Sequence, residues 1–142
     1  MRQEDKELLL QDLCGRLPYG VMIHLDDFPD AILMGINNGV AMLDDATHDP
    51  IHNVPWDIEY IKPYLFPLSS MTEEQKKFFK DRPIFLDSEN ELVVKEDFFG
   101  NSRFTMLEDW VEVILWLNKN HFDYRGLIKK GLAIDCTNLN IY

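Results

Sequence analysis

The residues of this chain that could ligate a metal gather in one short stretch, 44–52. Its carboxylates and imidazoles are Asp44, Asp45, His48, Asp49 and His52. Imidazole nitrogens and carboxylate oxygens suit Zn²⁺, Mn²⁺ or Fe²⁺. Pro50 lies between the two histidines and opposes the helix that would bring both to one face. Two interpretations follow: a metal site of His48, Asp49 and His52, or a polar loop whose residue types serve turn geometry alone. We predict no bound metal and no cofactor.

A second arrangement with possible chemistry is the pair His24 and Asp26. His24 lies within the apolar run 21–25, and Asp26 follows the run directly. Because they are two residues apart, their side chains would share one face of a strand. A carboxylate that orients a histidine base is one part of a nucleophilic site. The nucleophile is missing, because the chain has no Gly-x-Ser-x-Gly motif and no glycine-rich phosphate loop. The alternative is a half-buried strand histidine, and we assign no catalytic residue.

The charge of the chain is acidic and uneven. Its 142 residues contain 14 Lys+Arg and 25 Asp+Glu, a net charge of −11. Residues 17–61 hold eight of the carboxylates and no Lys or Arg. Nucleic acids and anionic membranes bind proteins largely through cations, so we predict neither as a partner. A basic protein partner, a metal ion or solubility alone could explain the acidic segment.

Another protein is therefore the partner that we expect. The candidate contact residues are Asp26, Asp27, Asp44, Asp45, Trp56, Trp116 and Arg125. The four aspartates belong to the acidic segment. Trp56 opens an aromatic run over residues 56–66, which forms either a binding groove or part of the core. The oligomeric state does not follow from the sequence.

Trp116 and Arg125 come from the last third of the chain. Trp116 falls on the polar side of a predicted helix, where a large apolar side chain marks an interface unless Phe122 or Tyr124 covers it. Arg125 follows Asp123 closely. It either clamps a carboxylate or phosphate group or fixes the corner between two helices.

The length, 142 residues, predicts a single domain that can bury a core without disulfides. The two cysteines, Cys14 and Cys136, have no neighbouring Cys or His, as expected of reduced thiols in the cytoplasm. The first residues lack the apolar stretch of a signal peptide. No window approaches the roughly 18 apolar residues of a membrane span. We expect a cytoplasmic location.

The first part of the chain, residues 1–68, has the pattern of one helix and a small sheet. Leu8, Leu9 and Leu13 share the inner face of a helix over 4–13, whereas Gln11 and Asp12 point outward. Strand-like runs follow at 21–25, 31–36, 40–43 and 63–66. Asn38-Gly39 is a strong hairpin signal. This spacing predicts a small antiparallel, barrel-like (SH3-like) sheet over 19–67.

The second part, residues 69–142, is predicted to be mostly helical. Capping boxes at Ser70/Glu73 or Thr72/Gln75, and at Thr105/Glu108, begin helices that end near residues 81 and 120. A hairpin over 84–95 lies between them, and a short helix follows over 123–130. The inner face of the long helix is predicted to be Leu107, Trp110, Val111, Ile114 and Leu117.

The fold class predicted from these elements is α+β. It consists of an N-terminal helix, a small antiparallel barrel-like sheet, and a helical C-terminal half with an inserted hairpin. The sheet part alone would be only marginally stable, so the two parts, 1–68 and 69–142, are expected to share one core in a single domain over 1–142.

Three stretches of the chain are distinctive together: residues 12–21, residues 58–74, and residues 116–128 with 131–133. They resemble a family of small uncharacterised proteins from gut Bacteroides genomes and their phages or other mobile elements. The resemblance implies an accessory role in a phage or prophage. It implies no activity, no cofactor and no catalytic residues.

Three hypotheses on function remain. The first is a non-enzymatic protein-interaction module that uses the acidic sheet face or the surroundings of Trp116. The second is a metal-dependent enzyme built on His48, Asp49 and His52. The third is an acidic mimic of nucleic acid that occupies a basic host protein, which requires carboxylates spaced like phosphates along one face.

Overall fold

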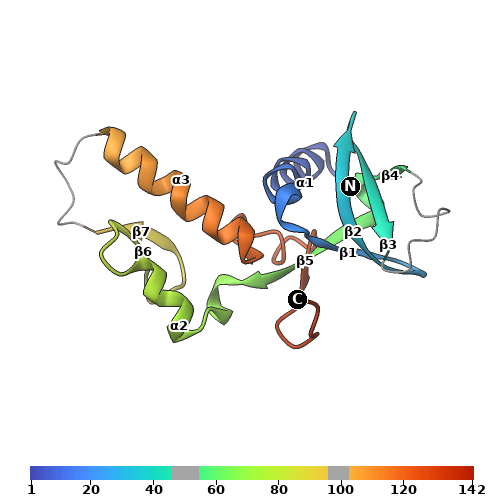
Figure 1. Ribbon diagram of the computed structural model, residues 1–142. Helices are drawn as coiled ribbons and strands as arrows, with labels where there is room; N and C mark the ends of the chain where they lie inside the picture. The colour runs from blue at the N-terminus through green and yellow to red at the C-terminus, as the bar shows by residue number, and fades with distance from the viewer. Residues whose placement is uncertain (46–54, 96–102) are drawn as a thin grey trace.

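The computed structural model describes residues 1–45, 55–95 and 103–142 (Figure 1). Its α-helices are α1 (Gln3–Arg16), α2 (Glu73–Lys76) and α3 (Arg103–Lys119). Short 3-10 turns occur at Leu17–Tyr19, Ile58–Tyr60, Leu68–Ser70 and Lys77–Phe79. The strands are β1 (Met22–Leu25), β2 (Phe28–Asn37), β3 (Val40–Asp45), β4 (Pro55–Asp57), β5 (Ile61–Pro67), β6 (Ile84–Leu86), β7 (Leu92–Val94), β8 (Phe122–Asp123) and β9 (Ile134–Asp135).

Seven of these strands form one sheet, in the order β4-β3-β2-β1-β5-β8, with β9 also on β5. The pairs among β1 to β5 are antiparallel, and β8 and β9 pair with β5 in parallel. Strands β6 and β7 form a separate antiparallel hairpin. The C-terminal segment thus contributes to the sheet that the N-terminal part begins.

The prediction of a barrel-like, SH3-like sheet is wrong. A barrel closes only when its outermost strands pair with each other. Among the described residues β4 pairs with β3 alone, and the opposite side of β5 is taken by β8 and β9. Phe122 and Ile134 stand opposite Phe66 and Tyr64 of β5. The sheet stays open because short C-terminal strands occupy the position that closure would need.

The prediction of a helical C-terminal half is also wrong, since α3 is the one long helix after residue 68 within the described ranges. Helix α2 is a single turn continued by a 3-10 turn to Phe79. No helix forms over the described residues 123–130. The Asp123 carboxylate accepts hydrogen bonds from the backbone N–H groups of Leu127 and Ile128, and Gly126 has φ +75°. This turn uses Asp123 as a local acceptor and breaks helical geometry at Gly126.

Several local predictions are confirmed. Asn38 has φ 52° and Gly39 has φ 77°. These are the left-handed conformations that a tight hairpin between β2 and β3 requires. Thr72 and Gln75 form the capping box of α2 through reciprocal side-chain to backbone bonds. The hairpin over 84–95 is present as β6 and β7, with Phe85 opposite Val93.

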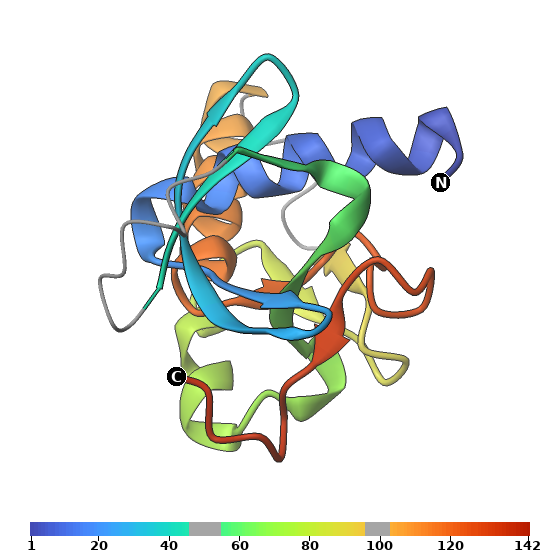
Figure 2. The ribbon, with the colours of Figure 1, turned by 90° about the vertical axis from the view of Figure 1, so that its right-hand side faces the viewer.

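Two hydrophobic clusters divide the interior, and Figure 1 shows the two lobes that they fill. In the first lobe α1 crosses one face of the sheet (Figure 2) and buries Leu9 and Leu13 completely. In the second lobe α3 packs on the β6–β7 hairpin and the segment around α2. Strand β5 runs between the lobes, and the carboxyl-terminal ends of α1 and α3 meet beside it at the waist of the molecule (Figure 1).

The buried face of α3 differs in part from the predicted one. Trp110, Ile114 and Leu117 pack in the second lobe as predicted, whereas Leu107 and Val111 are exposed. Trp116, expected on the wet side, stacks on Phe78 at a centroid distance of 4.3 Å and on Phe122 at 5.8 Å. Val113 and Leu117 are fully buried beside it. Apolar residues at eight of the eleven positions 107–117 nearly surround this helix, so periodicity alone does not select the inner face. The hydrophobic residues of the second lobe select the face that carries Trp116.

Candidate functional site

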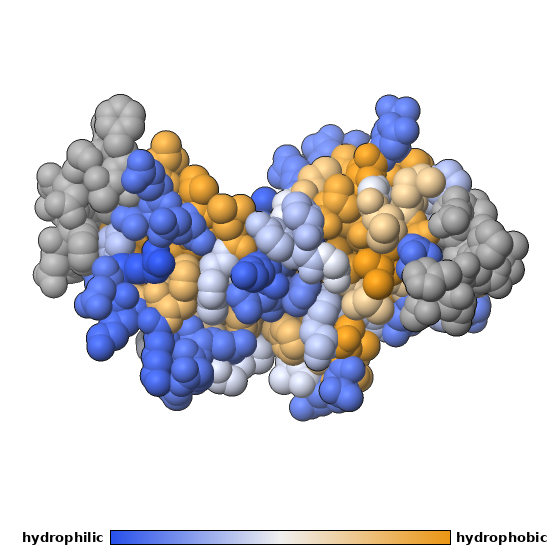
Figure 3. All heavy atoms as spheres, in the orientation of Figure 1, coloured by the Kyte–Doolittle hydropathy of each residue, from blue (hydrophilic) through white to orange (hydrophobic). Residues whose placement is uncertain are grey.

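The apolar side chains that α3 turns away from its lobe form an exposed stripe, defined here as Leu107, Val111 and Leu115. These side chains are 62%, 51% and 48% exposed. They are spaced by four residues, which aligns them as one ridge along the helix. Figure 3 shows apolar side chains along the edge of α3 that faces the notch between the two lobes. A ridge of this kind on a surface helix is a typical contact surface for another protein.

Shallow hollows flank the exposed stripe on both sides. One, of about 330 Å³, is lined by Leu107, Glu108, Val111 and Glu112. The other, of about 240 Å³, is lined by Trp110, Val111, Ile114 and Leu115. The second hollow shares Trp110 and Ile114 with a larger one of about 350 Å³ beside β7. The stripe therefore has a groove on each side, the relief into which the side chains of a second helix fit.

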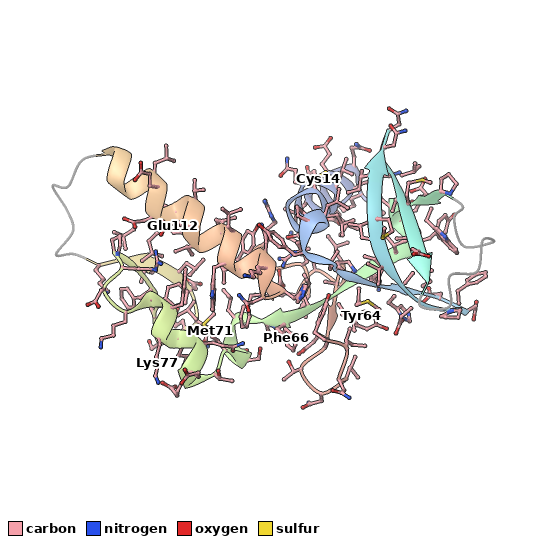
Figure 4. The ribbon with its side chains drawn as sticks, viewed as in Figure 1. Cys14, Tyr64, Phe66, Met71, Lys77 and Glu112 are labelled. Atoms are coloured by element: carbon pink, nitrogen blue, oxygen red, sulfur yellow. The ribbon has the colours of Figure 1, made fainter. Side chains whose placement is uncertain are left out.

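Carboxylates border the exposed stripe. Glu108 and Glu112 line the first hollow, and Glu91, at the start of the β7 segment, lines the larger one on the opposite side. Glu112 points from α3 toward the hairpin side (Figure 4), where it pairs with Arg82. Within the described part of the chain no cation pairs with Glu91 or Glu108. Among the described side chains, the carboxylates at the edges of the groove thus lack a paired cation, except for Glu112.

Helix α1 already covers the continuation of this face at the carboxyl-terminal end of α3. Asn118, one turn beyond the stripe, is only 3% exposed. It packs against Gly15 of α1 so closely that a Cβ at Gly15 would lie 3.2 Å from the Asn118 Nδ2 atom. One face of α3 is therefore helix-covered at its end and exposed over the two turns before it.

The second arrangement of interest joins β1, β2 and β5 at the sheet. The His24 Nδ1 atom lies 3.0 Å from the Tyr64 hydroxyl, and Nε2 lies 3.1 Å from Asp26 Oδ1, the contact that the sequence suggested. The Tyr64 hydroxyl donates to Asp30 Oδ1 at 2.7 Å. Tyr64 and Asp30 escaped the sequence analysis because β5 and β2 come together only through the sheet register.

This His24 cluster contains no activated nucleophile. Burial and the hydrogen bond to Asp30 raise the pKa of Tyr64 to about 12, so its phenol stays protonated and neutral. Asp26 is 91% exposed and Asp30 is 37% exposed, so solvent screens both carboxylates. The cluster links three strands and supplies no chemistry of the kind that a hydrolase needs.

The remaining candidates lie apart from one another. Asp26 and Asp27 form the β1–β2 turn, where Asp27 has φ +64°. Asp44 and Asp45 end β3, opposite Ile32 and Ala31. Within residues 1–45, 55–95 and 103–142, no three His, Cys, Asp or Glu side chains converge as a metal site would require. His48, Asp49 and His52 lie outside the described residues.

Trp56 and Arg125 have intramolecular partners. Trp56, on β4, packs edge-to-face against Phe28 at 5.3 Å. The Arg125 guanidinium lies 5.2 Å from the centre of the Tyr124 ring, and its Nε atom is 3.4 Å from Asp12 Oδ1. Arg125 therefore contacts α1, and the predicted corner between two helices is absent because residues 123–130 form no helix.

A buried ion pair at the waist was missed by the sequence analysis. The Arg16 Nε and Nη2 atoms donate to the Asp12 carboxylate at 2.7 and 3.1 Å, and both side chains are 0% exposed. Arg16 also donates to the carbonyl oxygen of Phe122 at 2.7 Å. Asp12, predicted to point outward, is thus buried, because it lies on the same helix face as Leu9 and Leu13. Its spacing of four residues from Arg16 was the available signal.

His121 packs next to this ion pair. Its ring stacks on Tyr142 with centroids 3.6 Å apart, and its Nδ1 atom is buried without a hydrogen-bond partner among the described residues. Burial, reinforced by the Arg16 cation, lowers the pKa of His121 to about 4. The folded protein therefore holds His121 as the neutral imidazole.

This lowered pKa predicts a loss of stability in mild acid. The unfolded chain binds a proton at His121 near pH 6.5 and the folded chain only near pH 4. The stabilising contribution is therefore present above 6.5 and falls as the pH drops toward 4. Between about pH 7 and about pH 5 the urea midpoint of the wild type should fall more than that of His121→Phe, which keeps an aromatic ring and cannot titrate. Equal falls would contradict the buried neutral imidazole.

The chain matches no protein-family model, no curated protein and no solved structure. None of the helices in the described ranges is long and apolar enough to span a membrane.

Proposed function

We propose that this chain is a non-enzymatic protein-interaction module whose docking surface is the exposed stripe of α3. The observation that carries the proposal is the contrast between the two faces of this helix. Trp116 and Leu117 anchor one face in the second lobe, while Leu107, Val111 and Leu115 stand exposed on the other. A surface helix that is apolar on both faces needs a second layer of protein.

The occupant that this surface favours is a helix of the partner protein. A ridge of residues spaced by four, with a groove on each side, is the relief that helix-on-helix packing uses. Helix α1 shows the same mode of cover at Asn118, where the face continues. Leu107 and Leu115 are eight residues apart. At about 1.5 Å per residue the stripe is about 12 Å long, so a partner helix of three to four turns would cover it.

The setting of this function is part of the same proposal. The resemblance to proteins of Bacteroides phages and mobile elements supports an accessory role in a phage or prophage. The free thiols of Cys14 and Cys136 support a reducing compartment such as the cytoplasm. Cys14 lies exposed on α1 (Figure 4).

The test replaces a residue at the centre of the stripe. Val111→Glu should weaken binding of the purified partner at least about tenfold, because a carboxylate buried in an apolar contact loses its hydration. The partner is first identified through a photo-cross-linker placed at position 111, and binding is then titrated with pure components. Met34→Glu is the matched control, since Met34 is a 60% exposed apolar residue on β2, in the other lobe.

Unfolding curves of both variants should match that of the wild type, because both positions are exposed. Binding that Val111→Glu leaves unchanged, or that Met34→Glu weakens equally, would contradict the assignment of α3 as the docking surface.

A further inference from the structure

We infer that the partner segment is a basic amphipathic helix, with an apolar face on the stripe and cations toward the carboxylates at its edges. This inference rests on the proposed docking surface and adds the charge of the occupant. It is carried by where the acidic residues stand relative to the exposed stripe, on both sides of the groove.

The carboxylates lie where a second helix would place its flanking residues. Glu108 lines the hollow on one side of the ridge. Glu91 lines the hollow on the other side, together with Trp110 and Ile114. A helix seated on Val111 would therefore meet a carboxylate at each edge. Lys and Arg at the flanking positions would pair with them while long aliphatic stems cover the apolar walls.

The net charge of the chain argues against two other occupants. A dimer would bring together two chains that each carry a net charge of −11. Their electrostatic repulsion opposes a self-complementary dimer. An anionic membrane surface would be repelled in the same way. A basic helix is attracted by the whole chain as well as by Glu91 and Glu108, so its association should be fast and sensitive to salt.

Glu112 differs from Glu91 and Glu108 because it has a cation partner, Arg82. Arg82, just before the β6–β7 hairpin, forms an ion pair with Glu112. The Arg82 guanidinium also lies over the Phe78 ring, 4.3 Å from its centre. Glu112 is thus already paired with a cation of the second lobe, so its negative charge is partly compensated. The test therefore uses Glu91 and Glu108.

The experiment uses two designed peptides with the same apolar stripe of leucines on an alanine-rich helix. One carries lysine and the other glutamate at the flanking positions. The lysine peptide should bind the full chain about tenfold or more tightly than the glutamate peptide, and raising the salt should narrow the difference. Glu91→Gln with Glu108→Gln should remove most of the difference. The control variant, Glu73→Gln with Glu74→Gln, removes two charges on α2. It should leave the difference in affinity between the two peptides unchanged.

The outcomes separate the two claims. Equal binding of both peptides, abolished by Val111→Glu, would overturn the basic helix and leave the docking surface standing. Lysine-peptide binding that Val111→Glu does not weaken would overturn both, since the peptide would then follow the overall acidity. Binding of neither peptide, or dimerisation of the chain through the stripe in sedimentation experiments, would also overturn the basic helix as occupant.

Discussion

Trp116→Ala should lower the free energy of unfolding by about 3–5 kcal/mol, as expected for removal of a large packed aromatic. The Trp116 indole stacks on Phe78 at 4.3 Å and on Phe122 at 5.8 Å, and meets Phe79 edge-on at 5.8 Å. Alanine would leave a cavity among three rings. The loss is a large fraction of the about 5–15 kcal/mol that stabilises a typical domain.

The measurement is urea unfolding followed by far-ultraviolet circular dichroism. Leu115→Ala is the matched control on the neighbouring helix position, because Leu115 is 48% exposed. Its cost should stay within about 0.5 kcal/mol, as is usual for surface substitutions. A cost of Trp116→Ala below about 1 kcal/mol would show that this side chain does not anchor α3. The assignment of Leu107, Val111 and Leu115 to the exposed face of α3 would then be wrong.

The second large effect concerns the buried carboxylate at the waist. Asp12→Ala should cost about 3–5 kcal/mol, because a buried charge without its partner is strongly destabilising. The charge left behind is the fully buried Arg16 guanidinium. Arg16→Met should cost less. The Arg125 Nε atom, 3.4 Å from Asp12 Oδ1, remains to compensate the carboxylate after Arg16 is gone.

Two further variants test the assignment. Removing both charges in Asp12→Leu with Arg16→Met should recover a large part of the stability, since an apolar pair of similar volume avoids the desolvation of both ions. The surface pair of Lys6 and Asp57, 3.3 Å apart and 34% and 43% exposed, is the control. Lys6→Met should cost at most about 1 kcal/mol. Equal losses in the free energy of unfolding for Asp12→Ala and Lys6→Met would contradict the assignment of Asp12 and Arg16 as a buried ion pair.

The sequence was a good guide where a few adjacent residues determine the backbone. Asn38 and Gly39 adopt positive φ because their side chains tolerate it. The reciprocal bonds of Thr72 and Gln75 require only one helical turn. The helix α1 and the β6–β7 hairpin follow from apolar periodicity in the same way. Each of these elements depends on neighbours within a few positions.

Prediction failed where distant segments compete for one place. Strand β5 could have closed a barrel, and instead Phe122 and Ile134 from the C-terminal segment pair beside it. Strands of two residues, such as β8 and β9, are too short for an alternating apolar pattern, so the sequence gives no signal of their parallel pairing. Asp123, the first residue of the helix predicted over 123–130, instead accepts backbone hydrogen bonds within the turn that follows β8.

The candidate site shows the same limit. The apolar residues of α3 were visible, and the predicted inner face was right for Leu117 and its neighbours Trp110 and Ile114. It was wrong for Leu107 and Val111, which are exposed, and it left out Trp116, which packs inside. A helix that is apolar nearly all round has two solutions by periodicity. The three phenylalanines that surround Trp116 come from residues 78, 79 and 122, and only the tertiary fold brings them to that face.

The most direct test of the central claim is methyl nuclear magnetic resonance during titration with the lysine peptide. The methyl groups of Leu107, Val111 and Leu115 should shift together and saturate with one affinity. The Met22, Met34 and Met42 methyls of the sheet should stay unchanged. Shifts confined to the sheet methionines, with the α3 methyls unmoved, would contradict α3 as the docking surface of this chain.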